Sequence, residues 1–565
     1  MGQNRQFHID YTVDVSNPET GRFRVTANVQ NLNQPRLDLS LPVWTPGWYT
    51  IENYAKNISR FRITDEKGAA LPHTMTRKQT WGVDTKGHHD IEIEFDYAAT
   101  IMELNQAKIT KDFAFFTGTQ LFLMAEGHRN SPSTVHFVVP AGWKIISALK
   151  ETSDPQTFTA PDYDTLVDSP TELGHFDVTR FEVEGKPHYL VVTPAGSLSP
   201  ERTQNAVAGM AAVASAASAV FGGLPYEKFV YFYFFLESGG GLEHSNSYVM
   251  MGAQNNRRPQ LASGHEFFHL WNVKRIRPVD LWPYDYSREN DSSLLWVSEG
   301  LTEYYGPLLE YRAGLRDQAG FLNIVGNAIG EEENSEARKY LSPSESSMSA
   351  WQAYDKSQQQ YYTQGENLAA LLDLSIRHDT HDASSLDDVM RGLYRECYER
   401  GKGFSTEDII NIINRLTKRD YHDFFRRYVS GVEVPPYDTI FGYAGYRLKK
   451  ESVRRPVFGA DAEPLANGRT LKVLSVDPGS PADAAGLAAD DVVLKVDNRT
   501  RVPFGFYDEH NAGRTLKVTI RRAGEEKELT ITLGARDEVA YSLVEEAQPT
   551  PEQLKVRSGW LAVNK

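Results

Sequence analysis

The first 170 residues alternate apolar and polar positions in short runs. Examples are "FRVTANVQ", "IEIEFDYAAT" and "STVHFVVPAG", and turn-forming stretches such as "NLNQPRL" and "DTKGHHD" separate them. Alternation with a period of two between turns is typical of half-buried strands. We therefore predict an antiparallel β-sandwich over residues 1–172.

The pattern changes at about residue 175. A strand, "PHYLVVTPAG", leads into an Ala-rich helix over residues 206–224, and an aromatic strand, "KFVYFYFFLES", follows. After Gly264 the apolar residues recur with helical spacing, as in "LLWVSEGLTEYYGPLLEYRAG" and "YYTQGENLAALLDLSIRH". These patterns predict a second domain over residues 173–438, first β-rich and then helical. The acidic, Ser-rich segment from 329 to 351 predicts a mobile loop between helices.

Strand patterns return after "VEVPPYDT" and continue to about Gly534. Within them, "VDPGSPADAAGLAADDVVLKVDN" resembles a PDZ domain closely, so we place that module at residues 439–540, followed by a charged C-terminal tail at 541–565. Its carboxylate-binding loop would be "FGYAGYRL", which departs from the usual Gly-Leu-Gly-Phe pattern. Peptide capture, self-contact and orientation of the preceding domain all stay open for this module. The predicted fold is multidomain α+β.

Length, charge and cysteine content narrow the class of protein. A chain of 565 residues is too long for one core, and its net charge of −15 argues against nucleic acid and anionic membranes as partners. The single cysteine, Cys397, excludes a disulfide framework and a Cys-rich zinc module. No signal peptide is recognisable, which predicts a cytoplasmic location, or a periplasmic one if a leader was removed. Oligomeric state stays open.

The Ala-rich segment at 206–224 is the strongest candidate for a membrane span in the sequence. It consists mainly of Ala, Gly and Ser, whereas bilayer spans favour bulkier apolar residues. We therefore expect a helix packed inside a folded domain.

Candidate chemistry begins with "SGHEFFHLWNVKRIRP". In a helix, His265 and His269 lie on one face, one turn apart, so both can bind one ion. Glu266 lies on an adjacent stripe, close enough to hold a water molecule at that ion. This helical geometry is the physical basis of the His-Glu-x-x-His motif. An amphipathic helix with two histidines that bind no metal is the alternative.

A catalytic zinc site needs a third protein ligand. Thirty residues after His269, "LLWVSEGLTEYY" places Glu299 and Glu303 four apart among apolar residues. A buried carboxylate needs a partner, and a metal is a suitable one. Glu299 could then be the third ligand, with Glu303 accepting the N–H of a ligand histidine. The alternative is a solvated face that carries both glutamates.

These two segments together resemble the M61 family of glycyl aminopeptidases, which belongs to the gluzincin zinc peptidases. The resemblance rests on "HEFFHLWNVKRIRP" followed by "WVSEGLTEYY" and extends over most of the chain. It implies a β-rich N-terminal domain, a thermolysin-like catalytic domain and a C-terminal PDZ domain. It also implies one Zn²⁺ per chain held by His265, His269 and Glu299, with Glu266 as general base.

An aminopeptidase must also recognise a free ammonium group. "LESGGGLEHSNSYVMMG" offers three glycines, Gly239, Gly240 and Gly241, through which backbone can approach a substrate, followed by Leu242 and Glu243. The segment resembles the Gly-x-Met-Glu-Asn segment of the related M1 aminopeptidases. By that resemblance Glu243 binds the substrate's α-amino group. A glycine-rich hairpin with an exposed glutamate is the alternative.

The same M1 enzymes place a transition-state tyrosine in a Tyr-x-Lys-Gly segment. Tyr362 to Gly365 aligns with it, although Gln364 replaces the lysine and Tyr361 is a rival. We expect Tyr362 to stabilise the oxyanion. The aromatic segment at 42–61 could form part of the substrate wall, but packing in the core and turns of the sandwich is the favoured interpretation.

Three functional hypotheses follow. The first is a zinc aminopeptidase that acts on peptides with a free N-terminus and releases small residues such as Gly and Ala. The second is a zinc endopeptidase whose PDZ domain recruits unfolded or C-terminally recognised proteins. The third, a non-catalytic PDZ adaptor, is disfavoured because every residue of the expected zinc site is present.

Overall fold

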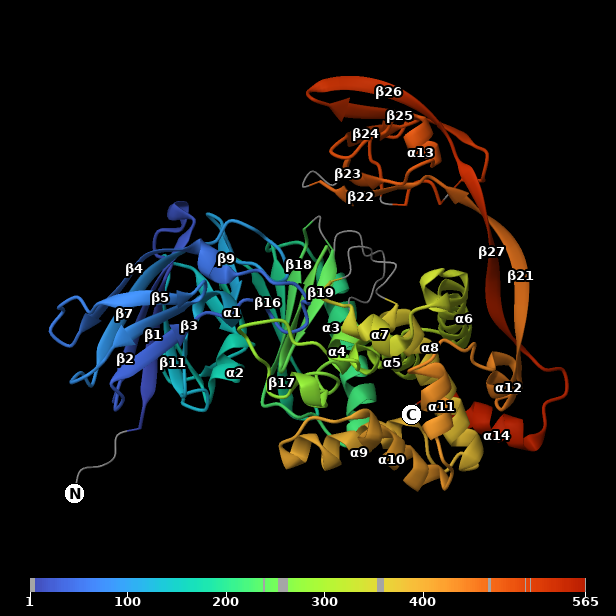
Figure 1. Ribbon diagram of the computed structural model, residues 1–565, viewed down its shortest axis with the longest axis horizontal. Coiled ribbons are helices and arrows are strands. Elements are labelled where there is room, and N and C mark those ends of the chain that lie inside the picture. Colours follow the sequence, from blue (N-terminus) through green and yellow to red (C-terminus); the bar gives the residue numbers. More distant parts are fainter. Residues whose placement is uncertain are drawn as a thin grey trace.

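The computed structural model describes residues 6–236, 239–252, 263–352, 360–465, 469–503, 505–508 and 510–563. A β-rich N-terminal region adjoins a mixed middle region, and a small β domain stands above the latter on a long two-stranded ribbon (Figure 1). The architecture is the multidomain α+β fold that the sequence predicts.

The N-terminal region contains three sheets. The first has the order β13-β14-β11-β1-β2-β7-β4, the second β10-β3-β6-β5 and the third β12-β15-β9-β8. Their strands are β1 (His8–Asp14), β2 (Arg22–Gln30), β3 (Arg36–Ser40), β4 (Ile58–Asp65), β5 (His73–Arg77), β6 (Thr80–Asp84), β7 (Ile91–Ala98), β8 (Lys108–Ile109), β9 (Phe113–Thr117), β10 (Met124–Ala125), β11 (Ser133–Val138), β12 (Lys144–Ser147), β13 (Lys150–Glu151), β14 (Thr157–Ala160) and β15 (Pro170–Gly174). Short helices connect them: η1 (Pro18–Thr20), η2 (Tyr54–Asn57), α1 (Gly118–Leu121) and α2 (Tyr163–Val167).

The predicted alternation places the core of this region between sheets. Alternate residues of β1 and β2, including Val13 and Val25, are buried in one core with Leu39 of β3 and Trp81 of β6. The prediction of a purely antiparallel sandwich is wrong in one pair, because β1 runs parallel to β11. Alternation reports which face is buried and carries no information on the direction of a distant partner strand.

The middle region begins with a five-stranded mixed sheet of order β16-β17-β18-β20-β19. Its strands are β16 (Asp177–Val183), β17 (Lys186–Thr193), β18 (Phe229–Phe234), β19 (Gly240–His244) and β20 (Ser247–Met251). Strands β17, β18 and β20 are parallel, and β19 is an antiparallel edge strand. Every residue of β18 is buried, since Tyr231 packs into the main core and Phe232 packs with Phe115 of the N-terminal region.

The rest of the middle region consists of helices. They are α3 (Pro200–Phe221), α4 (Gly264–Phe268), η4 (Val279–Leu281), the π-helical turn η5 (Trp296–Gly300), α5 (Leu301–Arg312), α6 (Gln318–Asn334), η6 (Ala337–Lys339), α7 (Pro343–Met348), α8 (Tyr361–Asp379), α9 (Leu386–Glu396), η8 (Tyr398–Arg400), α10 (Thr406–Thr417), α11 (His422–Tyr428) and α12 (Tyr437–Gly442). Of these, α3 and α4 contact the sheet. Within the described part of the chain, α3 alone is long and apolar enough to cross a bilayer, and more than half of its apolar stretch is buried. Cys397 ends α9 and is buried.

The prediction of a mobile loop for the acidic segment from 329 to 351 is wrong. This segment contains the end of α6 together with η6 and α7. Ser342 and Glu345 form a reciprocal capping box at the start of α7. Ser and Glu in this segment therefore serve as helix caps and helix formers, a role that composition alone does not reveal.

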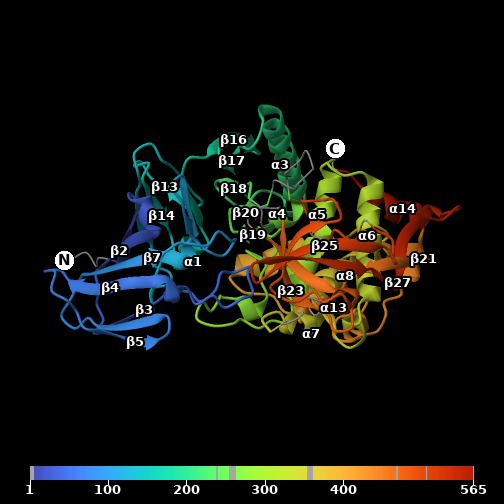
Figure 2. The ribbon, with the colours of Figure 1, turned by 90° about the horizontal axis from the view of Figure 1, so that it is seen from above.

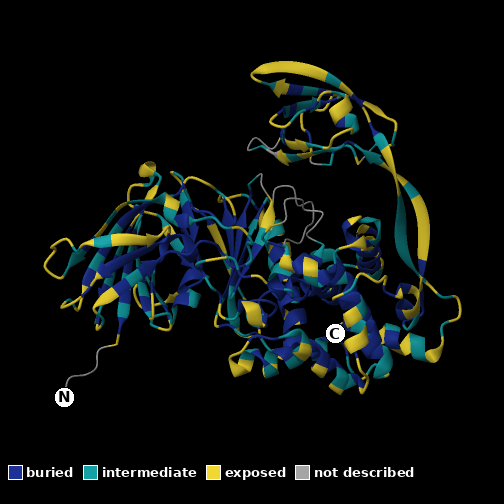
Figure 3. Cartoon of the chain, in the orientation of Figure 1, coloured by how far each residue is buried: buried dark blue, intermediate teal, exposed yellow. Residues whose placement is uncertain are grey.

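The C-terminal β domain is joined to the helices by the ribbon of β21 (Tyr446–Val457) and β27 (Gly534–Glu545). Its sheet has the order β22-β23-β24-β25-β26, and its elements are β22 (Ala460–Pro464), β23 (Leu471–Val476), α13 (Pro481–Ala484), β24 (Val492–Val496), β25 (Thr515–Arg522) and β26 (Glu525–Thr532). This domain lies over the helices of the middle region, and its core is separate and small (Figures 2 and 3).

Two details of this region differ from the sequence analysis. "FGYAGYRL" forms the end of α12 and the start of β21, below the ribbon, so it is no carboxylate-binding loop of the small sheet. The described part of the predicted tail, residues 541–563, completes β27 and forms α14 (Pro551–Trp560). Trp560 is fully buried, and its indole N–H donates to the Tyr304 hydroxyl at 2.8 Å.

Candidate metal centre and active site

Helix α4 holds the predicted histidine pair although it is only five residues long. Ser263 caps its N-terminus, where Ser263 Oγ accepts the backbone N–H of Glu266 at 3.2 Å. His269 is the C-cap and still has helical backbone angles, so the one-turn spacing from His265 is kept. Phe267 and Phe268 are buried behind the two histidines and fix the orientation of this short helix.

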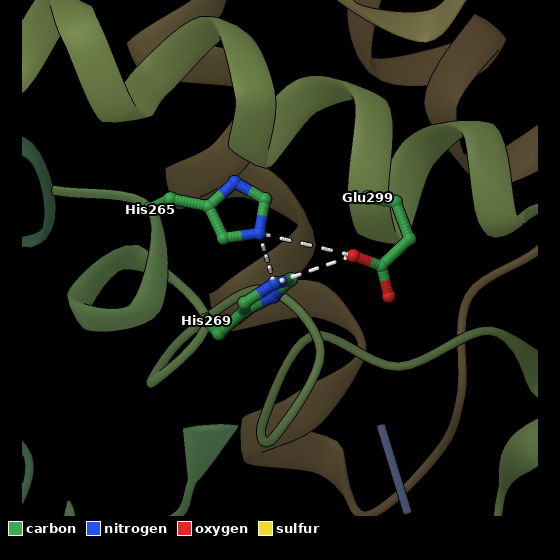
Figure 4. Close-up of side chains that lie close together, drawn as sticks. All are labelled: His265, His269 and Glu299. Atoms are coloured by element: carbon green, nitrogen blue, oxygen red, sulfur yellow. Dashed lines mark hydrogen bonds and ion pairs between the residues drawn. The ribbon is translucent and has the colours of Figure 1, made fainter. Parts of the chain in front are cut away.

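The two histidines and Glu299 converge on one point (Figure 4). The Nε2 atoms of His265 and His269 are 2.9 Å apart. Glu299 Oε2 lies 3.4 Å from His269 Nε2 and 4.0 Å from His265 Nε2. Ligand atoms around a tetrahedral zinc ion stand roughly 3.3 Å apart, so the three separations suit one small cation.

The hydrogen-bond partners of the rings support the same fit. His269 Nδ1 lies 2.7 Å from the Asn272 carbonyl and His265 Nδ1 lies 3.5 Å from Glu303 Oε1, so each Nδ1 carries the proton. Two unprotonated Nε2 atoms then face each other beside a carboxylate. Such an arrangement is repulsive by itself and is stabilised by a cation, which is the chemistry of a zinc donor set.

A π-helical turn presents Glu299 to the histidines. The turn η5 widens the helix just before α5, and such turns frequently occur at functional sites. Asn272 ties the segment after α4 to this turn, because its amide donates to the carbonyls of Val297 and Ser298 at 2.8 and 3.2 Å. The Asn of the "LWN" segment thus holds two of the predicted ligand-bearing segments together.

Tyr49 is a site residue that the sequence analysis missed. Its hydroxyl donates to Glu299 Oε1 at 2.8 Å, across 250 positions of the chain, and so orients the carboxylate. The interpretation of segment 42–61 as core and turn packing is therefore only partly right. Trp44 and Tyr54 are fully buried, but the loop between them reaches the site. No local signal could distinguish these roles.

Glu266 lies against the edge strand β19. A Cβ atom on Gly241 would stand 2.0 Å from Glu266 Oε1, so only glycine allows this approach. Burial raises the pKa of Glu266 to about 7, His265 and His269 oppose this rise, and the carboxylates of Glu243 and Glu299 add to it.

Glu243 lies next to the same group. Single ligand-type atoms of Glu243, Glu266 and His269 all lie within 4.8 Å of one another. The Glu243 side chain is 5% exposed, and a Cβ on Gly47 would approach its carboxylate to 2.6 Å. The exposed-glutamate alternative is therefore wrong, and the N-terminal loop at Gly47 forms one wall of the site.

The remaining residues of the predicted binding segment differ in orientation. Gly239 and Gly240 are exposed at the open end of β19. Leu242 is buried in the cluster with Phe232 and Val249, so only its backbone can contact a substrate. Its neighbours Gly241 and Glu243 point to the opposite face of the strand, as the period of two requires.

Tyr361 and Tyr362 begin α8, which touches η5 backbone to backbone. A Cβ on Gly300 would lie 2.3 Å from Gly365 Cα, and this close contact brings the tyrosines toward Glu299. Burial, followed by the carboxylate of Glu299, raises the pKa of both tyrosines, and Glu243 and Glu303 add to the rise only for Tyr362. Both hydroxyls thus stay protonated.

One further group of potential ligands exists in the described residues. Asp65, Glu66 and His88 gather on the surface of the N-terminal region, and none of them is buried.

Comparisons with known proteins agree with this geometry. The family model of the peptidase M61 N-terminal domain matches residues 10–175, that of the M61 glycyl aminopeptidase matches 260–368, and that of the PDZ domain matches 456–533. A curated relative, the magnetosome formation protease MamE of Paramagnetospirillum magneticum, is 30% identical over 99 residues. That alignment covers 16% of this chain and only 14% of MamE.

Solved structures share the fold. An aminopeptidase N family protein from Idiomarina loihiensis superposes with a TM-score of 0.79 and 24% identity, covering 98% of this chain and all of the other. An M1 zinc metallopeptidase from Deinococcus radiodurans, bound to a Tyr-Ser-Ala substrate, superposes with a TM-score of 0.51 and 16% identity, covering 76% of this chain and 94% of the other. With its N-terminal domain, its His-Glu-x-x-His catalytic domain and its PDZ domain all matched, the chain belongs to the M61 family of metallopeptidases.

Proposed function

We propose that the protein is a zinc-dependent aminopeptidase that hydrolyses the first peptide bond of peptides with a free N-terminus. The observation that carries this proposal is the buried carboxylate of Glu243 within 4.8 Å of His269 and Glu266. That spacing leaves room for one residue between an anchored ammonium group and the bond to be cut. An endopeptidase cleft would have to continue past this point.

The residues His265, His269 and Glu299 would hold the zinc ion. When bound, zinc supplies a Lewis acid that polarises the scissile carbonyl and lowers the pKa of water. This is the only part of the chemistry that the side chains cannot provide.

The protein's own groups would perform the remaining tasks. Glu243 pairs with the substrate's ammonium group and fixes the amino end. Glu266 accepts a proton from the attacking water and later delivers it to the leaving amine. The Tyr362 hydroxyl donates to the carbonyl oxygen as negative charge develops there.

Crowding beside the anchor supports small N-terminal residues as the preferred substrates. The Gly47 loop stands so close to Glu243 and Leu242 that no additional carbon atom fits between them. We therefore propose Gly and Ala as the residues released.

Release of p-nitroaniline from glycyl- and alanyl-p-nitroanilide tests this function. We expect activity that a chelator abolishes and zinc restores, with leucyl- and phenylalanyl-p-nitroanilide cleaved more slowly. Activity that persists in the metal-free protein would contradict the zinc site, and equal rates for large residues would contradict the proposed preference. A PDZ-assisted endopeptidase remains the alternative, and cleavage of internal bonds in an unfolded protein would favour it.

A further inference from the structure

A buried ionic cluster lies behind the Glu243 carboxylate. Lys274, from the "WNVKRIRP" segment, has a side chain that is 1% exposed. Its ammonium group lies 3.1 Å from Asp168 Oδ1 and 3.4 Å from Glu243 Oε1, and it donates to the Pro46 carbonyl at 3.3 Å. One buried lysine thus connects two carboxylates and the loop that holds Gly47.

The two carboxylates are not equally satisfied. Asp168 accepts from the Ser245 backbone N–H at 2.7 Å and lies 3.1 Å from His244 Nδ1, in addition to Lys274. Glu243 Oε1 has no hydrogen-bond partner among the described residues and keeps only the longer ion pair with Lys274. Burial opposes ionisation of Asp168, but Lys274 and His244 outweigh it and hold its pKa well below the ordinary value.

The charge of the cluster follows from these contacts. His244 is buried, and its Nε2 has no partner within the described part of the chain, so a protonated ring would bury an unpaired N–H. A neutral ring that donates from Nδ1 to Asp168 fits the geometry. Burial opposes the charge on Lys274, but Asp168 and then Glu243 raise its pKa above the ordinary value. Two carboxylates and one ammonium group leave a net charge of about −1.

We propose that Lys274 is a positioning residue that, together with Asp168, sets both the place and the charge of Glu243. Lys274 offsets one of the two buried negative charges and leaves the second on Glu243, where the substrate's ammonium group neutralises it. The inference rests on the proposed role of Glu243 as amine anchor. It extends that role by naming the buried groups that make Glu243 a receptor for one positive charge.

Substitutions that change the net charge of the cluster by a known amount test the proposal. Asp168→Asn brings the net charge to zero and leaves Lys274 paired to Glu243 alone. The double variant Asp168→Asn/Lys274→Met returns the net charge to −1 without either partner. Lys274→Arg keeps the charge, and Lys228→Met, which removes another largely buried lysine paired to Glu151 at 2.9 Å, is the matched control.

Binding can be measured without turnover in the Glu266→Gln background. The probes are glycyl-alanine amide and its N-acetyl counterpart, titrated by calorimetry into zinc-loaded protein whose folding has been checked by circular dichroism. We expect Asp168→Asn to weaken binding of the free-amine peptide by about tenfold or more, as for loss of a charge-assisted contact. The double variant should recover part of that loss, and Lys274→Arg and Lys228→Met should bind nearly as the parent does.

The outcomes distinguish the proposed role of Glu243 from the proposed role of Lys274 and Asp168. If the parent binds the acetylated and free peptides equally, the proposed role of Glu243 fails, and this inference fails with it. If the parent prefers the free amine but Asp168→Asn leaves that preference unchanged, only the inference is overturned. A double variant that binds worse than Asp168→Asn would also overturn it, because a merely structural cluster predicts additive losses and no recovery.

In the active protein the same variants should separate KM from kcat. Asp168→Asn should raise KM for alanyl-p-nitroanilide by about tenfold with a smaller change in kcat, since the charge acts on the bound amine. A fall in kcat at unchanged KM would contradict the assignment.

Discussion

Two buried ionic clusters in the middle region show how structural and functional charges differ. In the helical part, Arg377 donates to Asp373 at 3.0 Å and to Asp382 at 2.7 Å. Asp373 also accepts from the Tyr304 hydroxyl at 2.7 Å and from the Leu386 backbone N–H at 3.0 Å. Beside the predicted metal ligands, the contact between Lys274 and Glu243 is only a 3.4 Å ion pair, and Glu243 Oε1 lacks a hydrogen bond among the described residues.

Both clusters are buried, but they differ in whether every carboxylate oxygen has a hydrogen-bond partner. Each oxygen of Asp373 is paired, and that cluster joins α8 to α5 and, through Tyr304, to Trp560 of α14. A complete cluster stabilises the fold and has no capacity left for a ligand. The cluster around Lys274 retains an unsatisfied carboxylate oxygen, Glu243 Oε1, beside the predicted metal ligands. We infer that incomplete pairing of a buried charge marks the functional group here.

The largest effect is expected for the proton acceptor of the cleft. Glu266→Gln should keep its zinc content but lower kcat by about two to four orders of magnitude, because the amide cannot accept a proton. Metal analysis and steady-state kinetics check both parts. An active Gln variant would remove Glu266 from its proposed role.

The saturated cluster should respond in stability and not in substrate binding. Arg377→Met leaves the buried carboxylate of Asp373 and the partly buried carboxylate of Asp382 without their cation, and should destabilise the fold by about 3–5 kcal/mol. Chemical denaturation followed by circular dichroism measures this loss. The fraction that stays folded should keep its KM. A raised KM would show that this cluster also affects substrate binding, which would contradict the proposed difference between the two clusters.

The tyrosine pair at the start of α8 offers a comparison within the site. Tyr362→Phe should lower kcat by roughly a hundredfold or more, as for loss of an oxyanion donor, whereas Tyr361→Phe should change it little. Each variant removes one hydroxyl group, and the two positions are adjacent, so each variant serves as the other's control. The reverse result would assign the donor to Tyr361.

A smaller effect should come from the N-terminal loop. Gly47 has φ of +99° and lies against Glu243, so Gly47→Ala adds both backbone strain and a clash with the anchor. We expect KM to rise by roughly tenfold, the scale of one weakened charge-assisted contact. Gly68→Ala is the matched control, because Gly68 has φ of +77° and open space around it. Equal kinetic effects of the two variants would show that strain alone is responsible.

Sequence patterns predict the parts of this site that depend on local spacing. His265, His269 and Glu266 follow from the helical period, and Glu299 follows from a second apolar helix that needs a partner for a buried carboxylate. The resemblance to zinc aminopeptidases supplied Glu243 and Tyr362, whose roles remain proposals.

The parts that escaped prediction depend on contacts between distant segments. Tyr49 meets Glu299 across 250 positions, and Lys274 meets Asp168 across 106. Neither contact produces a periodic pattern in the sequence from which it could be predicted. The prediction of a loop for residues 329–351 failed for another reason: charged and Ser-rich stretches can cap and form helices, and their burial depends on tertiary partners.

The central claim is that the cleft recognises a free ammonium group next to the bond that it cuts. The most direct test compares kcat/KM for alanyl-p-nitroanilide and N-acetyl-alanyl-p-nitroanilide with the zinc-loaded protein. We predict that acetylation lowers kcat/KM by about a hundredfold or more, because it removes the charge that Glu243 receives and adds bulk where the cleft ends. Equal cleavage of the two substrates would contradict the account.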